Sequence, residues 1–251
     1  MPVSARQEGG ITEDEFNAVL DEFEEVYQPI VTEAGGKLDV RRKWNDSTVN
    51  ASAQRMGNTY VLNMFGGLAR YHNMNKDGFM LVVCHEAGHH LGGAPKVSGW
   101  FNNWASNEGQ ADYYATLRCL RYIWDDEENR QWLENNEVDP IAKTKCEETF
   151  NTQEEEVLCM RTAAAGQAMA FFFQDVRKET TIPKFDTPDP KEVSKTDDAH
   201  PATQCRMDTY LTGSVCLHDI HQALSDEDPK VGTCNEGAET IGTRPHCWYK
   251  P

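Results

Sequence analysis

The stretch Val83-Cys84-His85-Glu86-Ala87-Gly88-His89-His90 decides how the rest of the chain is interpreted. Residues four apart lie on one face of a helix, so His85 and His89 can direct two imidazoles at one metal ion. Glu86 lies beside them, where a carboxylate can accept a proton from a water molecule near that ion. This spacing predicts a metal-binding helix over about Asp77 to Leu91, in the arrangement that zinc metallopeptidases use.

A second informative stretch, Ser106-Asn107-Glu108-Gly109-Gln110-Ala111-Asp112, follows downstream. Catalytic zinc sites have three protein ligands and one open position, and two histidines with one glutamate is a known set. Glu108 is the candidate third ligand, and zincins with this glutamate are called gluzincins. Asp112 lies one helical turn later, where it can accept a hydrogen bond from a metal-bound histidine. The alternative is that both carboxylates are solvated charges on a helix surface, and the upstream motif disfavours it.

Composition limits the classes of function that this chain can have. The 251 residues carry a formal net charge of −17 and a pI of about 4.8, which disfavours nucleic-acid binding because that requires a basic face. No stretch approaches 18 apolar residues, so no transmembrane helix is expected. The patterns predict one zincin-like domain over 1–251 of α+β class, mostly helical, with a small hairpin or sheet beside the metal-binding helix. Its motif core is expected over about 49–213.

Eight cysteines, an even number with no Cys-x-x-Cys pair, favour disulfides over a thiolate zinc site. Up to four disulfides are expected, with Cys84 as the exception because it lies on the apolar metal-binding helix. Cys234 and Cys247 are expected to fix a C-terminal tail over about 225–251. Disulfides predict a secreted or periplasmic protein, and because Met1 to Gly10 lack the apolar core of a signal peptide, a removed leader is implied. A cytoplasmic protein with buried free thiols is the alternative.

Local patterns predict the elements around the motifs. Thr12-Glu13-Asp14-Glu15 is a capping box that opens an amphipathic first helix. Residues 49–55 and 59–65 are predicted to form two strands joined by a turn at Gly57-Asn58. The edge of this hairpin can bind a substrate backbone by strand addition. A second capping box opens a helix over about Thr152 to Val176.

Two further segments have alternative interpretations. The segment 93–105 is expected to be a loop near the metal, and its tryptophans, Trp100 and Trp104, belong either to the core, which is slightly favoured, or to a substrate cleft. Phe171-Phe172-Phe173 is expected to be core rather than a binding patch. A surface loop over about 180–201 then leads to a helix over about 202–211.

Two outer motifs complete a resemblance to a known family. Asn50-Ala51-Ser52-Ala53 resembles the Asn-Ala-x-Ala strand of the CaaX prenyl protease and heat-shock HtpX family of zinc metallopeptidases. His200-Pro201 followed by Arg206 resembles the His-Pro-x-x-x-x-Arg motif of the same family. The order of the four motifs along the chain also agrees, and the resemblance covers about Val49 to Gly213.

The resemblance implies a role for each matching residue. His85, His89 and Glu108 are similar to the zinc ligands, and Glu86 to the general base. Asn50 and His200 are similar to the groups beside the oxyanion, with His200 as the N-cap of a helix that begins near Pro201, and Arg206 is similar to a support of the site. Many family members are embedded in membranes, whereas this chain has no transmembrane pattern, so a soluble branch is expected and a role on prenylated proteins is not.

The function expected from these residues is zinc-dependent hydrolysis of peptide bonds in a peptide or protein substrate. Zn²⁺ would activate water and the scissile carbonyl, with Glu86 as the base. Two alternatives stay open at this point. One is a zinc hydrolase that acts on a non-peptide amide, such as a cell-wall component, and the other is a zinc-bearing binding protein or chaperone without turnover.

Overall fold

An acidic helix, α1 (Glu13–Glu33), opens the part of the chain that this computed structural model describes, which is residues 9–99 and 103–251. Thr12 is its N-cap and makes both hydrogen bonds of the capping box with Glu15, as the sequence predicts. The buried side chains of α1 recur at helical spacing and include Phe16, Leu20 and Phe23. This apolar stripe packs α1 against the sheet and against α3 (Lys76–Leu91).

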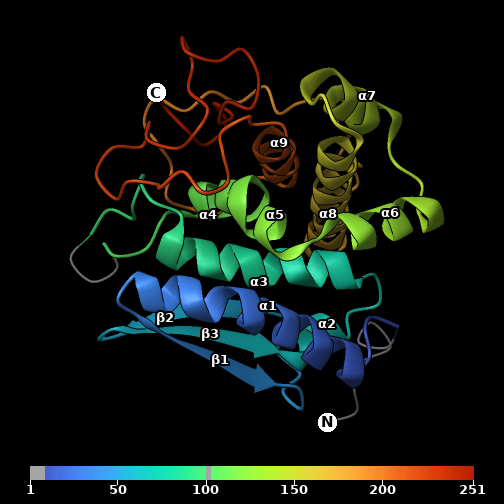
Figure 1. Ribbon diagram of the computed structural model, residues 1–251, viewed down its shortest axis with the longest axis vertical. Coiled ribbons are helices and arrows are strands. Elements are labelled where there is room, and N and C mark those ends of the chain that lie inside the picture. The colour runs from blue at the N-terminus through green and yellow to red at the C-terminus, as the bar shows by residue number, and fades with distance from the viewer. Residues whose placement is uncertain (1–8, 100–102) are drawn as a thin grey trace.

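A three-stranded sheet in the order β1-β3-β2 lies below α1 and α3 in Figure 1. Strand β1 (Lys37–Lys43) runs parallel to β3 (Thr59–Phe65), and β2 (Ala51–Met56) runs antiparallel to β3. Gly57 forms the hairpin turn with a positive φ of 61°. The predicted hairpin is confirmed, with its first strand beginning at Ala51. As an edge strand, β2 has one row of backbone groups that no strand in residues 9–99 and 103–251 pairs.

Two helical segments cross the centre of the molecule and contact each other. The first, α3 (Lys76–Leu91), has Asn75 as its N-cap and is buried along almost its whole length. The second consists of α4 (Glu108–Tyr114), the π-helical segment η2 (Ala115–Cys119) and α5 (Leu120–Ile123) in direct succession. The helix over about Asp77 to Leu91 and the helical turn that relates Glu108 to Asp112 were predicted, whereas the π-helical interruption was not. A short helix, α2 (Gly66–Ala69), connects the sheet to α3.

The remaining helices lie on the side of α3 away from the sheet (Figure 1). They are α6 (Asp126–Asn135), α7 (Pro140–Thr149), α8 (Gln153–Arg177) and α9 (Thr203–Ser214). Helices α6, α7 and α9 all pack against α8. The architecture is therefore α+β and mostly helical, as the sequence predicts. No helix in the described ranges has both the length and the apolar composition needed to cross a bilayer.

All eight cysteines form disulfides, which pair Cys84 with Cys119, Cys146 with Cys159, Cys205 with Cys247, and Cys216 with Cys234. The prediction that Cys84 is the exception was wrong. Burial in an apolar helix does not isolate a cysteine when another helix packs beside it, and α3 packs directly on η2 at this point. The predicted attachment of the tail through Cys234 and Cys247 is confirmed.

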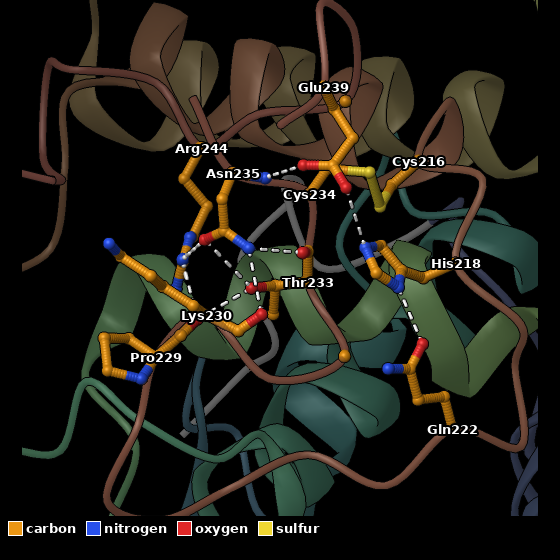
Figure 2. A network of polar contacts seen from close by, with 12 residues as sticks. Cys216, His218, Gln222, Pro229, Lys230, Thr233, Cys234, Asn235, Glu239 and Arg244 are labelled. Atoms are coloured by element: carbon orange, nitrogen blue, oxygen red, sulfur yellow. Dashed lines mark hydrogen bonds and ion pairs between the residues drawn. A yellow bond between two sulfur atoms is a disulfide. The ribbon is translucent and has the colours of Figure 1, made fainter. Parts of the chain in front are cut away.

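The C-terminal segment after α9 is held by polar side chains rather than by regular elements. Figure 2 shows Arg244, which donates hydrogen bonds to the Pro229 carbonyl and to Asn235 Oδ1. Nearby, the carboxylate of Glu239 accepts a hydrogen bond from the Asn235 backbone N–H and contacts His218. These contacts give hydrogen-bond partners to polar groups of the loops, including the part-buried Pro229 carbonyl, and so fix the arrangement of the loops.

Candidate metal centre

His85 and His89 lie one turn apart on α3, with their ring centroids 4.8 Å apart. Nδ1 of His85 donates a hydrogen bond to Asp112 Oδ1 at 2.8 Å, and Nδ1 of His89 donates to the Ser106 carbonyl at 2.8 Å. Because Nδ1 is the donor in both rings, Nε2 is the nitrogen that each ring directs toward the other ligand atoms. The two rings are therefore oriented as metal-bound histidines are.

Glu108 brings its carboxylate to the same point from the first turn of α4, where Asn107 is the N-cap. Its Oε2 lies 3.2 Å from Nε2 of His85, and its Oε1 lies 3.8 Å from Nε2 of His89. Glu108 Oε2 is buried, and it also lies 2.9 Å from Nδ1 of His200. One ligand atom from each of the three residues lies within 4.8 Å of the others. These acceptors converge as they would around a cation, and a His₂Glu set suits zinc.

Two other groups of residues in the described ranges have ligand atoms close together, but both depend on cysteines. Cys216 and Cys234 lie near His218, and Cys205 and Cys247 lie near Asp189. The cysteines of each group are joined in a disulfide, so they present no thiolate to a metal. Figure 2 shows the first of these disulfides beside His218, whose ring nitrogens contact Gln222 and Glu239. The three residues on α3 and α4 are therefore the candidate metal centre.

Asp112 connects the metal centre to α9. Besides His85, its carboxylate accepts hydrogen bonds from Arg206 Nε at 2.8 Å, Arg206 Nη2 at 2.6 Å and the Tyr210 hydroxyl at 2.8 Å. The side chain of Asp112 is fully buried, which raises its pKa, but the charges of Arg206 and His85 outweigh burial and lower it. Asp112 is therefore held ionised, as the acceptor that fixes the orientation of His85. The hydrogen bond predicted from His85 to Asp112 is present, and Arg206 pairs with Asp112.

The charges around the centre favour a cation between the ligands. Burial lowers the pKa of His85, but Asp112 and then Glu108 outweigh it and raise the pKa to about 10. Burial raises the pKa of Glu108, but its contacts with His200 and His85 outweigh burial and lower it. Both carboxylates thus stabilise positive charge at this point. Burial raises the pKa of Glu86, as is common for a carboxylate that acts as a base.

A cavity of about 520 Å³ opens next to these residues. Its walls come from the β2 edge with the residues just before it, from α3 and from α8. Glu86 lines this cavity together with His85, His89 and Glu108. Asn50 is exposed and also lines it, on the chain leading into β2. The structure therefore brings the predicted base, the predicted ligands and Asn50 to one cavity.

His200 also lines the cavity, although not from the N-cap of a helix. Helix α9 begins at Thr203 with Ala202 as its N-cap, so the prediction that His200 is the N-cap was wrong, whereas the helix predicted over about 202–211 is confirmed. The Pro201 carbonyl accepts a hydrogen bond from Arg177, which holds it outside the helix. His200 lies in the irregular segment before α9, where its Nδ1 is 2.9 Å from Glu108 Oε2 and its side chain is 63% exposed.

Several cavity residues were not predicted as functional. Phe172, Phe173 and Arg177 line the cavity from α8, although Phe171-Phe172-Phe173 was expected to be core. Phe172 serves both roles, because it is buried and lines the cavity. Trp104 lines the cavity and stacks on His90 with ring centroids 4.7 Å apart, which corrects its slightly favoured assignment to the core. Trp100 lies outside the described residues.

No protein-family model, curated protein or solved structure matches this chain significantly. The resemblance to the CaaX prenyl protease and HtpX family therefore stays a prediction from its four motifs.

Proposed function

We propose that this chain is a zinc-dependent peptidase of the gluzincin type, with a zincin-like fold related to a soluble branch of the CaaX prenyl protease and HtpX family. One observation carries the proposal. Nε2 of His85, Nε2 of His89 and the Glu108 carboxylate converge, and the buried carboxylate of Glu86 lines the same cavity. His85, His89 and Glu108 would hold the zinc ion.

Glu86 has the properties of a general base in this proposal. A zinc ion held by the three ligands supplies Lewis-acid chemistry, which makes water more acidic and polarises the scissile carbonyl. Glu86 takes the proton of the attacking water and later delivers it to the leaving amine. Its burial and raised pKa support both transfers, because a carboxylate that holds a proton more tightly is a better base.

The substrate backbone would lie along β2. This strand is at the sheet edge, and Ala51, Ser52 and Ala53 line the cavity. Its unpaired N–H and carbonyl groups can bind an extended peptide by strand addition. Asn50 directly precedes β2 and His200 lies beside Glu108, and both line the cavity, where their N–H groups can stabilise the oxyanion that develops at the carbonyl.

The Glu86→Gln variant tests the proposal, because it removes the base and keeps the size of the side chain. It should bind zinc and fold as the wild type does, but hydrolyse denatured casein more slowly by roughly 10² to 10⁴. Zinc content, thermal unfolding and casein hydrolysis are measured on both proteins, with a chelator-treated sample as control. Wild-type rates from the zinc-loaded variant would contradict the proposal.

The same assay separates the alternative functions. Wild-type protein that binds zinc but hydrolyses no peptide would favour either a binding protein or a hydrolase of another amide, and profiling with cell-wall amides then distinguishes these two. The four disulfides support a proposed location outside the cytoplasm, in a secreted or periplasmic setting.

A further inference from the structure

The cavity holds two arginines, and only one of them is neutralised by a buried partner. Arg206 is paired in bidentate fashion with the buried Asp112. The other is Arg177, at the end of α8, whose side chain is 32% exposed. The acidic residues that line the cavity are Glu86 and Glu108, which belong to the catalytic centre. A chain with a net charge of −17 therefore has a cation in the wall of its cavity.

Arg177 is held in place by one part of its guanidinium group only. Nη1 donates hydrogen bonds to the Pro201 carbonyl and to Thr203 Oγ1, both at 3.2 Å. Its ion pair with Glu179 has a separation of 3.9 Å between two partly exposed side chains, which makes it weak. Nε and Nη2 make no hydrogen bond to any residue in the described ranges. Two donors in a planar fork are thus available to a ligand.

The same helix supplies an apolar surface next to this cation. Met169, Phe172, Phe173 and Val176 line the cavity from one face of α8, and the Arg177 guanidinium lies 5.5 Å from the Phe173 ring centre. Val176 is 41% exposed although it is apolar. A ligand that covers this wall would therefore be apolar along most of its length and anionic at its end.

We propose that Arg177 binds a carboxylate of the substrate, so that the enzyme prefers peptides with an apolar residue on the α8 wall and a carboxylate beside it. This inference rests on the proposed peptidase function. The carboxylate has two possible sources, the C-terminus of the peptide or an Asp or Glu side chain. The planar fork of arginine suits either one, since both present two oxygens in a plane.

The first test compares peptides that differ only in the carboxylate, using full-length protein loaded with zinc. One pair has a free or an amidated C-terminus, and another has Glu or Gln next to an apolar residue with the C-terminus amidated. The wild type should cleave the acid member of one pair with a kcat/KM roughly tenfold to a hundredfold higher than that of its neutral counterpart. The pair that shows the preference identifies the source of the carboxylate.

Variants then assign this preference to Arg177. Arg177→Met should bring the acid-to-neutral ratio of kcat/KM close to one, and Arg177→Lys should restore part of it, because lysine keeps the charge but loses the fork. Arg130→Met is the matched control, since Arg130 is on the surface of α6 outside the cavity and its loss changes the net charge equally. It should keep the wild-type ratio.

A binding measurement separates failure of this inference from failure of the proposed function. The same labelled peptides are titrated into zinc-loaded Glu86→Gln protein, where turnover is not required, and the acid member should bind more tightly by the same factor. Equal affinity for acid and neutral peptides, or a preference that persists in Arg177→Met, would overturn the inference while leaving casein hydrolysis as the test of the peptidase.

Discussion

Asp112 is the residue that connects the candidate ligands to the rest of the molecule. It is fully buried and accepts hydrogen bonds from His85, Arg206 and Tyr210. The orientation of the His85 ring therefore depends on a carboxylate that is itself held from α9. A buried ion pair of this kind is sensitive to the loss of either partner, because the remaining charge is left in an apolar environment.

Asp112→Asn should weaken zinc binding and also destabilise the fold. The variant keeps the size of the side chain but leaves Arg206 without its counterion, so we expect zinc affinity to fall by about 10- to 100-fold. The free energy of unfolding should fall by about 3–5 kcal/mol. Zinc titration and urea denaturation measure the two effects. Asp208→Asn is the control, since Asp208 is on α9, the helix that carries Arg206, and is largely buried, but bonds to Asp189 and Gln204 instead. Wild-type zinc affinity in Asp112→Asn would contradict this role.

His200→Ala tests the resemblance to the CaaX prenyl protease and HtpX family. If His200 assists the oxyanion, its loss should lower kcat by roughly 10² to 10³, with little change in KM, because the interaction strengthens only in the transition state. Zinc content should stay at the wild-type level. Steady-state kinetics are compared with those of His72→Ala, which removes an exposed histidine outside the cavity. Equal kinetics of the two variants would remove His200 from the mechanism.

The positions of individual site residues could be predicted from the sequence where two of them lie four residues apart on one helix. The spacing of His85 and His89, and that of Glu108 and Asp112, each place two side chains on one face, and the structure brings all four together. Arg177 was not predictable in this way, because its place in the cavity depends on how α8 packs against α9. Local sequence carries no information about that packing.

At the scale of elements, the contact between α4 and the C-terminal segment depends on a glycine. A Cβ atom at Gly109 would lie 2.1 Å from the Trp248 ring, which is fully buried and donates a hydrogen bond to Thr209. Gly109 follows the candidate ligand Glu108 directly. The C-terminal segment therefore packs directly against the first turn of α4, which carries Glu108.

Gly109→Ala should displace either Trp248 or the first turn of α4. We expect overpacking to cost about 1–3 kcal/mol of unfolding free energy, which exceeds the gain in helix propensity, and we expect weaker zinc binding as well. Chemical denaturation and zinc titration measure both. Gly78→Ala on α3 is the control, because its added methyl group would meet only side-chain atoms at 3.0 Å or more. A Gly109→Ala protein as stable as the wild type would show that Trp248 adjusts freely.

The elements with strong local signals were predicted and those without them were not. Capping residues and hydrophobic periodicity predicted helices α1, α3 and α8, with ends within a few residues of the observed ones. Helix α7 was missed because it is largely polar and buries little besides Ala142 and Cys146, although Asp139-Pro140 is a good start signal. The π-helical segment η2 has no local signal, because it forms where the helix adapts to its neighbours.

At the scale of the whole molecule, one disulfide joins two segments that contact the candidate metal centre. Cys205 precedes Arg206, which holds Asp112, and Cys247 precedes Trp248, which packs on Gly109. The Cys146–Cys159 disulfide joins α7 and α8, and neither cysteine lines the cavity. The two disulfides therefore differ in what they stabilise.

Replacing each pair by serine should separate these roles. Cys205→Ser with Cys247→Ser should cost about 4 kcal/mol of stability, since the bond closes a segment of 42 residues, and should also weaken zinc binding. Cys146→Ser with Cys159→Ser should cost about 3 kcal/mol, since its segment has 13 residues, and should leave zinc affinity unchanged. Equal zinc affinity in the two variants would contradict the proposed coupling. The sequence predicted disulfides from the cysteine count, but not these pairs, because pairing follows the tertiary contacts.

The most direct test of the central claim is the zinc content of the purified protein, measured by mass spectrometry of the metal without exposure to chelators. Wild-type protein should contain about one zinc ion per chain, as expected for a single His₂Glu site. The triple substitution His85→Ala, His89→Ala and Glu108→Ala should contain none while the four disulfides stay intact. Zinc that remains bound to the triple variant would contradict the assignment of the metal centre, and so would a wild-type protein that binds no zinc.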